Sequence, residues 1–388
     1  MLSDLRVVGL DRAVAAPLCT RILADWGADV IKVEQPPAGD FSRGWDGYVR
    51  GESSYFVLLN RGKRSLCVDL SQPRGHDALL RVLASADVFV HNLTRRALHK
   101  LELEPEALHE RFPRLVICSI WGYGPRGPYT TRKAYDMLVQ GETGLEAMTG
   151  PAEQPSRLGI PVADLGAGVY AALSILAGLH ARSLDGAGRV MEVSLFETML
   201  DWIAQPLAQW VNAGVGFKRN GLAHHLLVPY TAFMTRDRVL VNITCQQDSE
   251  WRSLCKQLDR PELADEPRFA TFELRRAARA KVEAELAALI GRLDAAELER
   301  RLDDGGIAHG RVRSVEEVAR HPQLEALGLL EDHGFGTLVG PVLTGARADR
   351  PPPALGEHNL EILSAAGCSP AEVRDLAADG ILIPATGP

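Results

Sequence analysis

The chain has 388 residues, of which 46% are apolar and 24% charged, a composition typical of globular proteins. Domains usually contain about 100–200 residues, so this length predicts one large domain and one smaller domain. The formal net charge of −7 argues against a nucleic-acid partner, which would require a basic patch, but it allows an anionic ligand bound by a few local cations.

The cysteines and the N-terminus indicate a cytoplasmic protein without a metal centre. None of the six cysteines forms a C-x-x-C pair, and no Cys/His cluster has metal-site spacing. The first residues lack the basic and then apolar segments of a secretory signal. No stretch approaches the roughly 18 continuous apolar residues of a spanning helix. We therefore expect a cytoplasmic protein with no membrane partner.

Strands and helices alternate over the first third of the chain. Short apolar runs predict strands at residues 5–10, 30–34, 65–70, 88–91 and 115–120. Helices are predicted at residues 17–26, 76–85 and 105–111. This alternation is typical of a mostly parallel sheet with helices on both faces. Ligands of such sheets bind beyond the carboxyl ends of the strands, so we expect functional residues in the loops at 35–46, 92–96 and 121–132.

The later part of the chain predicts a smaller, more polar domain at about residues 225–320. A long apolar helix at 166–183 precedes it. Within it we expect a strand at 239–244 and charged helices at 248–258, 273–291 and 295–304.

Two familiar kinds of site are not supported by the residues. The first β-α-β unit ends at Glu34, as in a dinucleotide-binding unit, but the turn at 11–17 has no glycine to admit a pyrophosphate. His224 and His225 are adjacent and so point to different sides, which makes a poor pair of metal ligands. We interpret them as a loop contact or a solvated pair.

A basic turn at residues 60–65 contains Arg61, Lys63 and Arg64. Two interpretations remain open for it. The turn is a solvated loop, or it anchors a phosphorylated ligand.

Asp164 is the most informative single residue. It comes just before the predicted long helix, where a carboxylate can cap free backbone N–H groups. However, glycines at 166 and 168 disfavour a helix, which suggests that something approaches the backbone closely there. A carboxylate with open space beside it can instead act as a nucleophile on a carbonyl carbon.

Eight segments together resemble the family III, or formyl-CoA-transferase-like, CoA-transferases, which also include carnitine and bile-acid CoA-transferases and 2-methylacyl-CoA racemases. The segments are residues 14–34, 60–70, 86–92, 122–129, 135–144, 161–178, 305–310 and 351–358. The resemblance implies an α/β fold with a large Rossmann-like, CoA-binding domain (1–200 and 322–388). A smaller α+β domain (225–320) is joined to it by linkers at 201–224 and 321. It also implies an interlocked homodimer.

The resemblance implies a role for Asp164 as well. Asp164 matches the nucleophilic aspartate of the family, which forms an aspartyl–acyl anhydride and then an enzyme–CoA thioester. Backbone N–H groups near Ala15 and Gly166 would stabilise the oxyanions. No metal or organic cofactor is needed, because coenzyme A is itself a substrate. The positions that match CoA contacts of the family are Val14, Ala15, Val68, Asp69, Leu70, Ser71, Asn92, Leu93, Thr94, Lys100, Lys133, Ala134, Tyr135 and Asp136.

Two positions and one segment depart from the family pattern. Val14 stands where some members have a glutamine that positions the acyl group. Gln35 stands where an arginine often contacts a phosphate. A Gly-rich lid has no clear counterpart near residues 243–247.

Tyr135 and Asp136 favour a transferase over a racemase. The racemases carry a His-Asp pair at these positions, and they need two bases at the α-carbon. Tyrosine, with a pKa near 10, is a poor base at pH 7. A racemase, or an acyl-CoA-binding protein without turnover, remains the alternative.

The substrate is expected to be a short dicarboxylate such as itaconate, mesaconate or citramalate, with succinyl-CoA as the CoA donor. This expectation rests on the similarity of residues 14–70 to family members that use such acids. Arg12, Arg43 and Arg50 are candidates for binding the second carboxylate, and surface arginines are the alternative interpretation.

Overall fold

The structure is a computed structural model that describes residues 1–347 and 350–383. The chain forms two compact units. Unit 1 contains residues 1–145, 158–205 and the described residues from 323 onward, and unit 2 contains residues 146–157 and 206–322. Along the chain, the C-terminal segment that follows unit 2 therefore belongs to unit 1 again.

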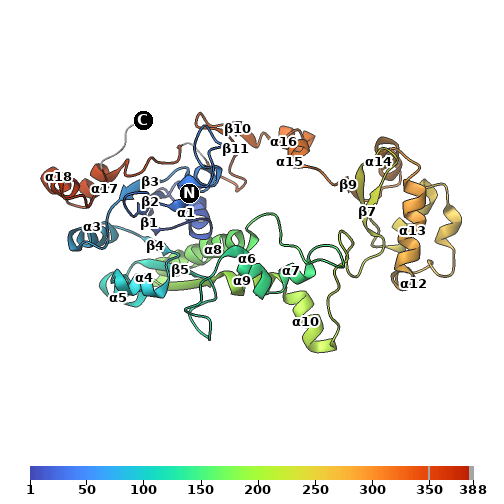
Figure 1. Cartoon of the computed structure of the whole chain (residues 1–388), viewed down its shortest axis with the longest axis horizontal. Helices are drawn as coiled ribbons and strands as arrows, with labels where there is room; N and C mark the ends of the chain where they lie inside the picture. Colours follow the sequence, from blue (N-terminus) through green and yellow to red (C-terminus); the bar gives the residue numbers. More distant parts are fainter. Residues whose placement is uncertain (348–349, 384–388) are drawn as a thin grey trace. The chain divides into compact units, whose positions relative to one another are not determined.

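Unit 1 is built on a six-stranded parallel sheet with the strand order β3-β2-β1-β4-β5-β6 (Figure 1). Its strands are β1 (Arg6–Leu10), β2 (Asp29–Glu34), β3 (Arg64–Cys67), β4 (Val88–His91), β5 (Val116–Trp121) and β6 (Val190–Ser194). Val7 of β1 lies opposite both Val30 of β2 and Val88 of β4. The strand order reverses between β1 and β4, and sheets of this class bind ligands in the crevice at that point.

The five predicted strands are confirmed, four of them to within one residue at each end. The strand at 65–70 is the exception, because β3 ends at Cys67. After β3 the chain turns to pair with the C-terminal segment. Val68 bridges Leu382, and the Asp69 N–H donates to the Ile381 carbonyl at 2.8 Å.

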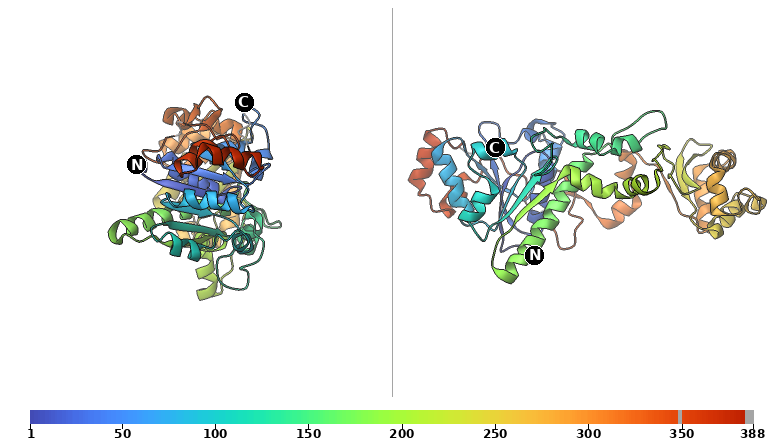
Figure 2. Two further views of the ribbon diagram at one scale, coloured as in Figure 1. Left: turned by 90° about the vertical axis from the view of Figure 1, so that its left-hand side faces the viewer. Right: turned by 90° about the horizontal axis from the view of Figure 1, so that it is seen from below.

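Helices cover both faces of the sheet, as predicted. On one face α1 (Ala15–Asp25) and α8 (Val162–Asp185) share one apolar cluster with the strands. On the other face lie α3 (Pro73–Leu83), α5 (Pro105–Arg111), α17 (Asn359–Ala365) and α18 (Pro370–Ala378). Figure 2 shows α8, in green, on the side of the sheet opposite α3 and α18.

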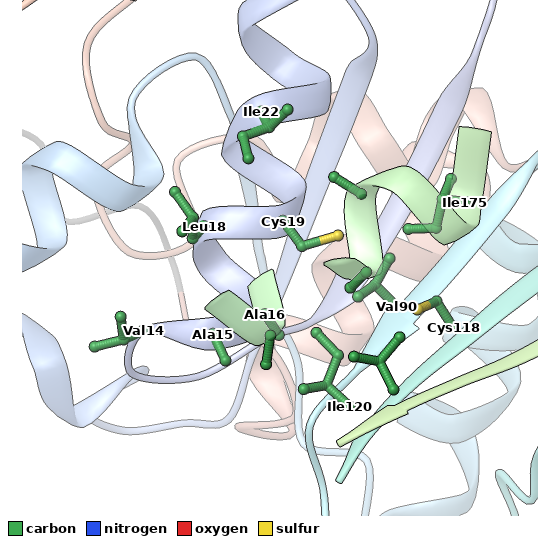
Figure 3. Packing of buried hydrophobic residues seen from close by; sticks show 14 of the residues in the cluster. Val14, Ala15, Ala16, Leu18, Cys19, Ile22, Val90, Cys118, Ile120 and Ile175 are labelled. Carbon is green, nitrogen blue, oxygen red and sulfur yellow. The ribbon is translucent and has the colours of Figure 1, made fainter. Parts of the chain in front are cut away.

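The core between α1, α8 and the sheet consists of small and branched side chains. Ala16 and Cys19 of α1 and Ile175 of α8 lie over Val90 of β4 and Cys118 of β5 (Figure 3). All five are completely buried. Small residues let the two helices lie close to each other and to the strands, which positions their N-terminal ends beside the sheet.

Helix α8 begins at Val162, four residues earlier than predicted, and ends at Asp185, where Gly186 adopts a left-handed φ of 81°. It is long and apolar enough to pass as a membrane span, which core helices of soluble proteins also do. In this chain α8 packs against α1, α9 (Leu195–Trp202) and strands β5 and β6.

Shorter elements complete unit 1. They are η1 (Phe41–Gly44), α2 (Ser54–Asn60), α4 (Arg95–Lys100), α6 (Asp136–Glu142), α16 (Pro322–Leu327), β10 (Leu330–Asp332) and β11 (Thr337–Val339). Two further helices, α7 (Leu145–Met148) and α10 (Ala204–Ala213), begin in unit 1 and belong mostly to unit 2.

Unit 2 is an α+β unit with its own core. Its antiparallel sheet has the order β7-β8-β9. Its elements are β7 (Tyr230–Met234), β8 (Leu240–Thr244), α11 (Asp248–Gln257), η2 (Pro261–Ala264), α12 (Phe272–Ala277), α13 (Arg279–Ile290), α14 (Ala295–Asp304), β9 (His309–Arg311) and α15 (Val315–Val318). The predicted helix at 273–291 is two helices, because Ala278 leaves the helical conformation with φ −99° and ψ 18°.

Candidate active site

Asp164 lies inside the first turn of α8, not before the helix as predicted. Its side chain is partly buried. Within residues 1–347 and 350–383, its carboxylate forms no hydrogen bond or ion pair, although its backbone N–H is bonded. Burial raises the pKa of Asp164 to about 7, and the negative charge of Asp136 adds to the rise. The carboxylate therefore has no protein partner among the described residues, and it is unusually basic.

The cap of α8 is Asp136. The first N–H groups of a helix have no partner within it. Here one oxygen of Asp136 accepts from the N–H of Ala163 at 2.8 Å and from that of Asp164 at 3.4 Å. Capping therefore does not explain Asp164, because another carboxylate performs that task.

The two glycines beside Asp164 are explained by helix packing. A Cβ on Gly168 would lie 2.6 Å from the backbone oxygen of Ala15 in α1. A Cβ on Gly166 would lie 3.0 Å from Thr198 and 3.1 Å from Trp202, both in α9. The interpretation that something approaches this backbone is confirmed, and the neighbours are the protein's own helices. The N–H of Gly166 lies in the second turn of α8, where it is used within the helix.

A buried ion cluster holds the turn between β1 and α1. The Lys32 ammonium donates to Asp11 and Asp40 at 2.9 Å each, and Lys63 donates to Asp11 at 2.9 Å. All four side chains are buried. Asp40 also accepts from the N–H of Ala13 at 3.2 Å. Ala13 has a φ of 61°, which costs a non-glycine residue about 1 kcal/mol or more, so the cluster fixes a strained turn.

The charges of this cluster depend on one another. Burial favours the neutral form of Asp11, but Lys32 and Lys63 hold the pKa of Asp11 far below its usual range. Burial opposes the charge of Lys32 too, yet Asp11 and Asp40 raise its pKa. Burial lowers the pKa of Lys63 to about 8. Near neutral pH the cluster is mainly an ionised structural unit.

The basic turn at residues 60–65 is neither a solvated loop nor a free anchor for a phosphate. Arg61 pairs with Asp25 at 3.1 Å and Arg64 with Asp29 at 2.5 Å. Arg61 is 1% exposed, Lys63 2% and Arg64 9%. These cations attach the turn to α1, to Asp11 just after β1, and to β2, which sequence spacing does not reveal.

One side chain joins the loops that follow β1 and β4. Asn92 accepts from the N–H of Arg12 at 3.0 Å and donates to the Arg12 carbonyl at 2.8 Å. The loops that follow β1 and β4 are thereby joined at the point where the strand order reverses.

Known proteins resemble this chain in sequence and in fold. Residues 2–359 match the model of CoA-transferase family III. The chain belongs to this family. It is 34% identical to the succinate–glutarate CoA-transferase of Agrobacterium fabrum, over 94% of this chain and 95% of that protein. It is 31% identical to the succinyl-CoA–D-citramalate CoA-transferase of Chloroflexus aurantiacus, over 94% and 93%.

A crystal structure of a CAIB/BAIF family protein from Brucella suis has the same fold. It is 33% identical, with a TM-score of 0.83 over 94% of this chain and 98% of that one. The present chain is therefore a CoA-transferase enzyme, and its six-stranded parallel α/β fold is that of its family.

The predicted CoA-binding positions of this CoA-transferase all lie in the segments that follow the carboxyl ends of β1, β3, β4 or β5. The segment after β4 includes Lys100, at the end of α4. The side chains of one group are buried and can offer a ligand little beyond backbone atoms: Val14, Ala15, Val68, Leu70, Leu93 and Asp136. The others are exposed or half-buried: Asp69, Ser71, Asn92, Thr94, Lys100, Lys133, Ala134 and Tyr135.

The three arginines considered for a second carboxylate differ in their partners. Arg43 binds Glu34 through two nitrogens at 2.8 and 2.7 Å. Arg50 pairs with Asp332 at 3.3 Å. Arg12 is exposed, and its guanidinium has no partner in the part of the chain that the structure describes.

Gln140 is a site residue that the sequence reasoning missed. It is completely buried on α6, and its amide donates to Asp136 at 2.6 Å. The available signal was a polar pair at the spacing i, i+4, which places both side chains on one helix face.

Proposed function

We propose that this CoA-transferase moves CoA from succinyl-CoA to a short dicarboxylic acid, with Asp164 as the covalent nucleophile. The observation that carries the proposal is the Asp164 carboxylate, which has a pKa near 7 and no protein partner among the described residues. The names of the two curated relatives, which pair succinate or succinyl-CoA with glutarate or D-citramalate, support the substrate class.

The reaction proceeds by four exchanges at carbonyl carbons. An Asp164 oxygen attacks the thioester carbonyl of the donor, the C–S bond breaks, and CoA thiolate leaves an aspartyl–acyl anhydride. The thiolate attacks the aspartyl carbonyl, and the donor acid leaves as a carboxylate. The acceptor carboxylate attacks the resulting enzyme–CoA thioester and releases the thiolate. The thiolate then attacks the acceptor carbonyl, which forms the new thioester and frees Asp164.

Coenzyme A is a substrate in this scheme, and neither a metal nor an organic cofactor takes part. Its phosphates require cations that are not already paired. Exposed cations without an ion-pair partner in the described residues follow β4 and β5: Arg96, Lys100, Arg126 and Lys133. They support binding of CoA along these loops, in place of the buried basic turn at 60–65.

Arg12 is the arginine that we propose for the second carboxylate of the acid. It follows β1 directly, at the crevice between β1 and β4, and its guanidinium is exposed. A charged hydrogen bond from Arg12 would favour dicarboxylates over monocarboxylates of equal length.

We also propose that the enzyme is an interlocked homodimer in the cytoplasm. Two features support the dimer. The chain returns to unit 1 after forming unit 2, so that two copies can pass through each other. In addition, no residue of α10 is buried in the single chain, and two of its large apolar residues, Trp210 and Val211, are 58% and 72% exposed. Exposed apolar side chains of this kind are typical of an interface.

The decisive experiment traps the covalent intermediates. Enzyme mixed with succinyl-CoA and no acceptor should accumulate the enzyme–CoA thioester. Hydroxylamine or borohydride should then modify Asp164 in the tryptic peptide 158–182, visible by mass spectrometry. Asp164→Asn should lose activity by orders of magnitude while remaining folded. The matched control is Asp201→Asn, an exposed carboxylate on α9 that bonds Tyr170. Label on another carboxylate, or an active Asp164→Asn variant, would refute the assignment.

A further inference from the structure

Asp136 is held in place by a buried network of its own. One of its oxygens accepts from the first N–H groups of α8, and the other accepts from the Gln140 amide at 2.6 Å. The side-chain oxygen of Gln140 accepts from the backbone N–H of Leu158 at 3.0 Å. Asp136 is 9% exposed and Gln140 0%. This network spans α6, the loop before α8, and α8 itself, so that Asp136 has one defined position.

An aspartate in the first turn of a helix ordinarily interacts with the N–H groups and the positive end of the helix. Hydrogen bonds of this kind favour the charged carboxylate and make it a weaker base. In this chain Asp136 occupies the N–H groups of Ala163 and Asp164. Asp164 is thereby denied those hydrogen bonds, even though it lies on the same helical turn.

The other charged groups near α8 are already paired. They lie on the elements that pack against it, and they are Arg21 and Asp25 on α1, Glu142 on α6, Glu192 on β6, and Glu197 and Asp201 on α9. Arg21 pairs with Asp25 and Glu142 with Arg132, both at 2.9 Å. Glu192 faces Arg95 and accepts from Trp121, Glu197 accepts from Ser194, and Asp201 accepts from Tyr170. Among the charged groups of residues 1–347 and 350–383, Asp136 is the one whose charge adds to the effect of burial on the ionisation of Asp164.

We propose that Asp136, fixed by Gln140, is a positioning residue that occupies the N-terminus of α8 and so keeps the Asp164 carboxylate unbound and strongly nucleophilic. The catalytic consequence rests on the proposed role of Asp164. Because nucleophilic strength falls as basicity falls, a carboxylate bonded to the helix N-terminus would attack a thioester more slowly.

The test compares Asp136→Asn with Asp136→Ala. Asparagine keeps an oxygen that can accept from Ala163 but loses the charge, whereas alanine loses both and frees the N–H groups for Asp164. Glu142→Gln, on the same helix, is the control. For each variant kcat/KM is measured between pH 5 and 9 with a fixed acyl-CoA and acid. The titration of Asp164 is measured separately. Each variant is compared with the same variant that also carries Asp164→Asn, and the difference between their free energies of unfolding is followed as a function of pH.

We expect the Asp164 titration and the acid limb of the kcat/KM profile to move together to lower pH. The plateau rate at high pH should fall several-fold, more in Asp136→Ala than in Asp136→Asn, and Glu142→Gln should leave all three unchanged. A purely structural role would lower thermal stability without moving the titration, and that result would overturn the proposal. If Asp164→Asn alone retains activity, the proposed function fails instead, while the titration still tests how Asp136 acts on Asp164.

Discussion

Asp164 illustrates how strongly a neighbourhood can change one carboxyl group. A burial penalty and one adjacent negative charge together raise its pKa to about 7. The elevated pKa serves a nucleophile well, since the group remains basic and still ionises near neutral pH. The same environment should be visible in stability, independently of any assay of turnover.

Asp164→Asn should become progressively more stable than the wild type as the pH rises. In the unfolded chain an aspartate ionises near pH 4, whereas folded Asp164 ionises near pH 7. Between these values the folded state binds more protons, so raising the pH destabilises the wild type but not the amide. The three-unit shift corresponds to about 4 kcal/mol. Urea unfolding at pH 4 and pH 8 measures it, and a difference that does not change with pH would contradict the shifted ionisation.

Arg12→Gln should selectively impair dicarboxylic substrates. A hydrogen bond to a charged group contributes about 1.5–3 kcal/mol, so kcat/KM for glutarate should fall by about 10- to 100-fold. The value for a monocarboxylate of similar length should change little. Arg50→Gln is the control, because Arg50 is paired with Asp332. Equal losses for both acids would assign Arg12 to CoA or to folding.

At the scale of elements, the site depends on the close packing of α8 against α1 and α9. The close contact at Gly168 is with backbone, the oxygen of Ala15, which cannot move aside as a side chain would. The N-terminal ends of α1 and α8 are thereby held close to each other.

Gly168→Ala should therefore destabilise the enzyme, although alanine is the better helix former. Overpacking of this kind costs about 1–3 kcal/mol. Gly178→Ala is the matched control on α8, because its nearest neighbour is the side chain of Val116 at 3.1 Å. Thermal unfolding of the two variants should show the larger loss at Gly168. Equal midpoints would indicate that α1 moves freely.

The buried cluster below the β1–α1 turn should be costly to break. Lys32→Met leaves Asp11 and Asp40 without a shared cation, and removing one partner of a buried ion pair costs about 3–5 kcal/mol. Arg74→Met, which breaks the exposed pair with Asp379, should cost at most about 1 kcal/mol. Denaturant unfolding of both variants compares the two pairs in one protein, and similar losses would contradict the structural role of the cluster.

At the scale of the whole molecule, the exposed apolar residues of α10 and the return of the chain to unit 1 lead to a specific prediction about assembly. The enzyme should sediment as a dimer of 42.2 kDa chains and remain one on dilution to nanomolar concentration, because interlocked chains cannot separate while folded. Its unfolding midpoint should rise with protein concentration. A folded, active monomer at low concentration would contradict the interlocked arrangement.

The sequence by itself determined the family, five of the six strands of the parallel sheet, and Asp164 as the residue to test. These features follow from local periodicity and from motifs that can be read along the chain. Only the tertiary structure decided which charges are available. It buries Arg61, Lys63 and Arg64 in ion pairs, and it brings Asp136 to the N-terminus of a helix that begins 26 residues later. Partners of this kind are chosen by how helices and loops pack in three dimensions, and spacing along the chain contains no record of that choice.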